Sequence, residues 1–291
     1  MVTKTKNLIS KRVRRCHNVP VTTLQYGQKS LWSTHAAAAA ALAFGAIGLF
    51  GFLSPYGYIG IALALVISGL TDKTFFKDVL LIAGALVLIS TISLAADISW
   101  GNMLRMGTVL TLAVLIPYLV SRFVYKDHAI RFPRRTGQPW SKLEWAWLLA
   151  TIILAWLILP VYFLGTGVYQ NWPAVVEWHE ILRLFVGVNA VGIWDELFFI
   201  CTIFTLLRRY LTFWVANVFT SMIFVSFLWE LGYQSIGPLL TIPFALVQAW
   251  IFTKTKSLPY TITVHLLFDA IVFLTIVHAH HPEALPIFPF T

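Results

Sequence analysis

The sequence predicts an all-α protein, a polytopic bundle of about eight or nine transmembrane helices with a cytoplasmic N-terminus. Of the 291 residues, 58% are hydrophobic and only 11% are charged, so polar residues are too few to cover a water-soluble globule of this size. Apolar runs long enough to cross about 30 Å of hydrocarbon recur along the chain. Lys and Arg collect in alternate connections, as expected of cytoplasmic loops.

Nine apolar runs are the candidate spans. We expect them near residues 36–53, 58–70, 79–95, 107–124, 145–164, 184–207, 213–231, 238–253 and 260–277. The second run is short for a span, so it is also compatible with a hairpin in which the first two helices do not both cross.

The distribution of basic residues supports this count. If the N-terminus is cytoplasmic and every run crosses, 19 of the 21 Lys and Arg residues fall on the cytoplasmic side, and only Arg105 and Arg183 do not. The net charge of +9 therefore belongs to helix ends that face anionic lipid, which is the predicted partner. We do not expect nucleic acid to be a partner, because the sequence predicts no soluble domain that would carry the positive charge.

The chain divides at a basic, proline-containing loop. Residues 1–35 are a basic tail that we expect to be disordered, 36–124 a four-span scaffold, 125–144 the basic cytoplasmic loop, 145–277 a five-span region and 278–291 a short outer tail. The front half carries no ionisable residue deep in a predicted span. No retention signal or transit peptide is apparent, so we place the chain in a prokaryotic cell membrane.

Four carboxylates and one histidine lie within the apolar runs of the back half: Asp195, Glu196, Glu230, His265 and Asp269. A charged side chain at the centre of a membrane costs roughly 3 kcal/mol on insertion scales, so such residues mark a transport pathway, a counter-ion or a catalytic centre. The alternative is a purely structural role, in which the carboxylates bond to neighbouring helices. Asn189, Asn217 and Gln248 are uncharged, and we expect them to form interhelical hydrogen bonds.

The spacing of these groups suggests acid–base chemistry. Asp195 and Glu196 are adjacent, and two carboxylates in a low dielectric do not readily ionise together, which prepares one of them as a general base or acid. His265 and Asp269 are four residues apart and share a helix face. There a carboxylate can fix the imidazole tautomer, or both groups can bind one ion or substrate. Glu230 lies nearer a helix end, so a simple end-of-helix carboxylate is its alternative interpretation.

Residues 180–277 resemble the CAAX prenyl protease and bacteriocin-processing (CPBP, or Abi-type) family of intramembrane proteases. The acidic pair is followed by two aromatic residues, then by the basic turn RRY, then by KTKSLPYTITVHLLFDA, which contains His265 and Asp269. The family pattern has an Arg four residues after the acidic pair, where this chain has Ile200. It also has a Phe followed four residues later by a His, and here Phe224 is followed by Leu228. Glu230, two residues on, is a candidate replacement for that His.

The resemblance implies hydrolysis of a peptide bond in a membrane-associated peptide or protein substrate. In that mechanism Glu196 would activate a water, and Asp195 would share the proton on Glu196. His265, oriented by Asp269, would stabilise the oxyanion or position the water. Two cofactor states stay open. Either a divalent ion such as Zn²⁺ or Mn²⁺ binds among Asp195, Glu196, Glu230, His265 and Asp269, or the site uses no metal.

Two other functions compete with a protease. Loss of the family Arg and His is what a catalytically inactive relative would show, surviving as a membrane scaffold or immunity protein. Buried acids also serve proton- or cation-coupled transporters, but these usually show repeat symmetry, and the acids here lie only in the back half. We favour the protease.

Overall fold

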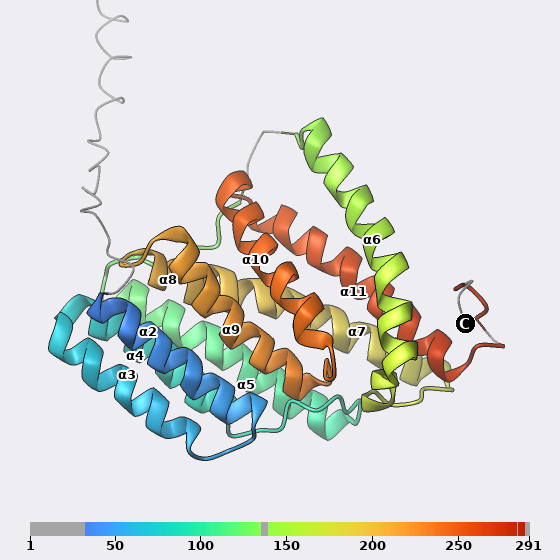
Figure 1. Cartoon of the computed structure of the whole chain (residues 1–291), viewed down its shortest axis with the longest axis horizontal. Helices are drawn as coiled ribbons and strands as arrows, with labels where there is room; N and C mark the ends of the chain where they lie inside the picture. Colours follow the sequence, from blue (N-terminus) through green and yellow to red (C-terminus); the bar gives the residue numbers. More distant parts are fainter. Residues whose placement is uncertain (1–32, 135–138, 284, 289–291) are drawn as a thin grey trace, which may run out of the picture.

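This computed structural model describes residues 33–134, 139–283 and 285–288. Within these residues there are nine helical rods, each a helix together with any helical segment that directly continues it, and there is no strand. Residues 1–32 of the predicted tail lie outside the described residues. The rods are α2 (Thr34–Ala46) with η2 (Ile47–Gly51), α3 (Gly57–Thr71), α4 (Lys73–Ile89), α5 (Trp100–Leu119) with η3 (Val120–Val124), α6 (Lys142–Thr166), α7 (Trp178–Asp195) with η5 (Glu196–Phe204) and α8 (Thr205–Arg208), α9 (Phe213–Leu231), α10 (Gly237–Thr255) and α11 (Leu258–His280). A short turn, η4 (Val168–Asn171), follows α6. The predicted all-α class is confirmed, and Figure 1 shows the arrangement.

Six of the described rods are long and apolar enough to cross a membrane, and α3 is a shorter apolar helix. The six are Thr34–Gly51, Trp100–Val124, Lys142–Thr166, Trp178–Arg208, Phe213–Leu231 and Leu258–His280. The chain is therefore an integral membrane protein. The count of eight or nine spans and the cytoplasmic N-terminus stay predictions.

The third predicted span was misplaced. We expected 79–95, but α4 begins at Lys73 and ends at Ile89. Asp72 caps the helix, since its Oδ1 accepts hydrogen bonds from the backbone N–H groups of Thr74 (2.7 Å) and Phe75 (2.9 Å). Because the helix begins directly after this cap, it includes Lys73, Lys77 and Asp78, all of which precede the apolar run. Asp78, which directly precedes the expected run 79–95, is buried with 2% exposure.

Helices α2 and α3 form a tight hairpin through glycines. A Cβ atom added at Gly57 would lie 2.6 Å from both the carbonyl oxygen of Gly45 and the backbone nitrogen of Leu49. Gly60 approaches Gly45 in the same way. Small residues let the two backbones touch, which is how helices in lipid gain packing energy.

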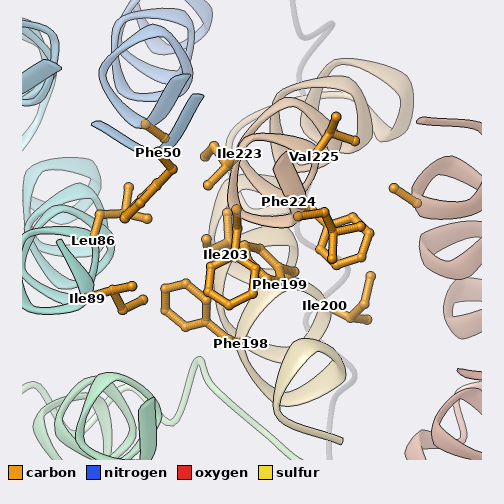
Figure 2. Packing of buried hydrophobic residues seen from close by; sticks show 14 of the residues in the cluster. Phe50, Leu86, Ile89, Phe198, Phe199, Ile200, Ile203, Ile223, Phe224 and Val225 are labelled. Carbon is orange, nitrogen blue, oxygen red and sulfur yellow. The ribbon is translucent and has the colours of Figure 1, made fainter. Parts of the chain in front are cut away.

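The front half packs against one side of the back half. Helix α2 and its continuation η2 contact α9, and one hydrophobic cluster runs through both halves. Figure 2 shows side chains from the front half meeting those of η5 and α9, among them Phe50, Leu86, Ile89, Phe198, Ile203 and Ile223. The front half thus supports the helices that carry the acidic pair.

A polar cluster joins the halves at the end of α8. One guanidinium nitrogen of Arg209, Nη1, donates to Asp78 Oδ2 at 2.7 Å and to Asp127 Oδ2 at 2.8 Å. Tyr210 donates its hydroxyl to Asp78 Oδ2 at 2.9 Å. Partial burial opposes the charge of Asp127, but hydrogen bonds from Ser121, the Ala129 backbone and Arg209 outweigh it and lower the pKa of Asp127.

We expect Arg209→Met to lower the free energy of unfolding by about 2 kcal/mol, because it leaves Asp78 as a buried carboxylate without its cation. The loss stays below that of a fully buried pair, since the Arg209 side chain is 31% exposed. Unfolding in mixed detergent micelles measures it. Arg122→Met is the control, because Arg122 is exposed on η3. Equal losses in the two variants would contradict the role given to Arg209.

Candidate active site

The helix that carries the acidic pair changes its winding at the pair. Helix α7 ends at Asp195, and the π-helical segment η5 begins at Glu196. The hydroxyl of Thr202 in η5 donates to the carbonyl of Leu197 at 3.0 Å, and the hydroxyl of Thr205, the first residue of α8, donates to the carbonyl of Ile200 at 3.0 Å, in each case five residues back. Segments of π-helix are rare and occur often at functional sites.

The structure brings four of the predicted residues together. Asp195 (3% exposed) and Glu196 (1%) face His265 (4%) and Asp269 (5%), which lie one turn apart on α11. The shortest contact joins His265 Nδ1 to Glu196 Oε1 at 2.7 Å, so the ring donates from Nδ1 when Glu196 is ionised. On the other side of the ring, Nε2 lies 3.7 Å from Asp195 Oδ2 and 3.9 Å from Asp269 Oδ1. The imidazole therefore stands between three carboxylates.

A fifth residue, Gln248 on α10, completes the group. Its Nε2 donates to Glu196 Oε1 at 2.9 Å, and its side chain is 2% exposed. The predicted interhelical bond of Gln248 thus exists, and it ends on the acidic pair. Asn217 also bonds between helices, from its Nδ2 to the carbonyl of Leu246 at 2.9 Å. Asn189 does not, because its Nδ2 donates to Phe185 on its own helix.

Gly192 allows α7 and α11 to approach at the site. A Cβ atom there would overlap Asp269 Oδ2 and lie 3.4 Å from His265 Cδ2. Gly192 stands one turn before the acidic pair. The role of Gly192 could not be predicted from the sequence, since it depends on which helix packs against this glycine.

Aromatic side chains enclose the imidazole. The rings of Phe244 and Phe224 lie 5.1 and 6.3 Å from that of His265, both edge to face. Tyr233, in the turn after α9, is also buried, which raises its pKa, and the nearby charges of Asp269 and Asp195 raise it further. Ile200 and Leu228, where the resemblance predicts an Arg and a His, are buried and apolar at 5% and 6% exposure.

Glu230 does not join the group. Its Oε1 accepts a hydrogen bond from the backbone nitrogen of Leu94 at 3.0 Å. It follows Phe224, which lies at the site, by six residues, or about 9 Å along the helix axis. The predicted five-residue metal set is therefore not assembled, and within the described ranges no group of three or more His, Cys, Asp and Glu side chains has an arrangement that holds a metal ion. Metal dependence stays a prediction.

Comparison with known families agrees with the motifs. Residues 177–271 match the family model described as type II CAAX prenyl endopeptidase Rce1-like. The match includes the acidic pair, Gln248, His265 and Asp269, and it confirms the resemblance predicted from residues 180–277. No curated protein and no solved structure matches the chain.

We expect Gly192→Ala to destabilise the fold by about 1–3 kcal/mol, the usual cost of overpacking, because the new methyl group displaces the Asp269 carboxylate. Detergent unfolding measures it, with Gly187→Ala on the same helix as control, since a Cβ there meets nothing within 4 Å. In a double-mutant cycle, Asp269→Ala should remove most of the cost. A cost that persists without the carboxylate would show that the close approach is not the cause.

Proposed function

We propose that this chain is an intramembrane endopeptidase, which hydrolyses a peptide bond in a membrane-associated peptide or protein with a water activated by Glu196. One observation carries the proposal. The Glu196 carboxylate is buried, and its Oε1 is held by both His265 and Gln248, while its Oε2 has no hydrogen-bond partner among the described residues. A carboxylate held at one oxygen presents the other as a base.

The atoms and protons of the proposed reaction balance with this base, a water and the peptide. Glu196 Oε2 takes a proton from the water, and the water oxygen forms a bond to the scissile carbonyl carbon while the carbonyl π electrons move to its oxygen. When the C–O double bond re-forms, the C–N bond breaks and Glu196 returns the proton to the leaving nitrogen. The products are a carboxylic acid and an amine, and the enzyme is unchanged.

His265, Asp195 and Asp269 support this step. His265 orients Glu196 through the 2.7 Å hydrogen bond. Asp195 and Asp269 lie within 4 Å of Nε2, where they stabilise positive charge on the ring. A charged ring beside the scissile carbonyl stabilises the oxyanion that forms on attack.

A lateral cavity supports a substrate that comes from the membrane. Helix α6 contacts α11 but leans away from α10 (Figure 1). Between these three helices lies an apolar cavity of about 210 Å³. Leu154 and Ile158 on its wall are 49% and 41% exposed, and Phe244 and Gln248 line it as well as the space beside Glu196. An apolar chain entering here reaches the acidic pair after passing Phe244.

The competing candidate is an inactive relative that acts as a membrane scaffold or immunity protein. Ile200 and Leu228 favour it, because neither binds a metal, donates a hydrogen bond or carries a charge at the place of the family Arg and His. Both proposals share the fold, so only a measurement of cleavage separates them.

The test is cleavage of membrane-tethered reporter peptides by the purified protein in nanodiscs. We expect Glu196→Gln to abolish cleavage, because an amide is not a base, and His265→Ala to reduce it at least about 100-fold, since Glu196 loses its orienting partner. Glu180→Gln, a change of the same kind near the start of α7, is the control and should cleave at the wild-type rate. A parallel series with chelator decides metal dependence.

The inactive relative predicts a different result. A folded wild-type protein that cleaves nothing in a broad peptide library, and is indistinguishable from Glu196→Gln, would refute the protease. Cleavage that survives in Glu196→Gln would refute the role of Glu196 while leaving a protease.

A further inference from the structure

A small buried cavity lies beside Glu196, within the group of helices α7, α9 and α10. Its volume is about 10 Å³, the size of a site for one water. Its polar lining comes from Asp195, Glu196, Thr220, Ser221 and Gln248, and the rest is apolar. Thr220 and Ser221 belong to α9 and had no place in the motifs.

Each polar residue of this lining has an unused hydrogen-bonding atom. Asp195 Oδ1, Glu196 Oε2, Thr220 Oγ1, Ser221 Oγ and Gln248 Oε1 are all buried, and none has a partner among the described residues. An unpartnered buried hydroxyl costs about 1–3 kcal/mol, so several around one cavity indicate a common ligand.

The two hydroxyls are unusual for this protein. Other buried Ser and Thr hydroxyls on the described helices have a partner, in most cases a carbonyl of their own helix, as Ser226 has in Ile223 at 2.7 Å and Thr275 in Ile271 at 2.7 Å. Thr220 and Ser221 make no such bond, which leaves their O–H groups and lone pairs directed to other partners. A ligand that both donates and accepts hydrogen bonds fits them best.

We propose that Thr220, Ser221 and Gln248 bind the water that Glu196 activates. The hydroxyls and the Gln248 Oε1 hold the water, while its acidic proton is given to Glu196 Oε2. This inference rests on the proposed function.

Kinetics of reporter cleavage tests the assignment. We expect Ser221→Ala and Thr220→Val each to lower kcat about tenfold and the double variant to lower it further, with KM unchanged, because the peptide does not contact these hydroxyls. Thr220→Ser keeps the hydroxyl and should stay within about twofold of wild type. Ser226→Ala removes a buried hydroxyl of α9 that already has a partner, and should leave kcat unchanged.

A structure that resolves water, of the wild type and of the double variant, gives a readout independent of activity. We expect one ordered water within hydrogen-bond distance of Ser221 Oγ and Glu196 Oε2 in the wild type and none in the double variant. A folded double variant with wild-type kcat overturns the inference and leaves the protease standing. An ordered water in a protein that cleaves nothing overturns the protease and the catalytic role of the water together.

Discussion

The hydrogen bonds to Glu196 Oε1 join three helices at one buried point. Glu196 is the first residue of η5, His265 belongs to α11 and Gln248 to α10. All three side chains are almost completely buried. In a lipid environment an unpaired carboxylate is expensive, so these bonds fix how the three helices sit against one another. The second oxygen, Oε2, has no hydrogen-bond partner in the part of the chain that the structure describes. Packing and proposed chemistry therefore depend on a single side chain.

The surroundings of this point differ on its two sides. Toward the front half, Phe198 and Phe199 of η5 belong to the same hydrophobic cluster as Phe50 of η2 and Leu86 of α4 (Figure 2). Toward α6 the packing opens into the apolar cavity beside Phe244. The packed side holds the carboxylates in place, and the cavity lies on the side from which we propose that the substrate enters.

The sequence predicted the all-α class and most of the helices, and it singled out four ionisable residues that the structure brings together. Both signals can be recognised in one segment without knowing which helices pack against it. The length of an apolar run indicates a membrane-spanning helix, and an ionisable residue within such a run indicates a candidate site residue. The residues that the sequence did not reveal depend on contacts between helices. Thr220 and Ser221 are ordinary in a membrane helix until their unused hydroxyls are seen beside Glu196, and Gly192 is ordinary until Asp269 faces it. The start of α4 was missed because the Asp72 cap extends the helix beyond its apolar run.

The winding of η5 affects how this chain can be aligned with its relatives. A π-helical turn takes roughly one residue more than an α-helical turn, since its hydrogen bonds reach five residues back instead of four. The extra residue lies between Glu196, at the proposed catalytic centre, and Arg209, at the junction of the two halves. In a homologue that is α-helical throughout this stretch, the residues equivalent to Glu196 and Arg209 point in the same directions only if the stretch is one residue shorter. An ungapped alignment between the acidic pair and the basic turn would then pair structurally unrelated positions.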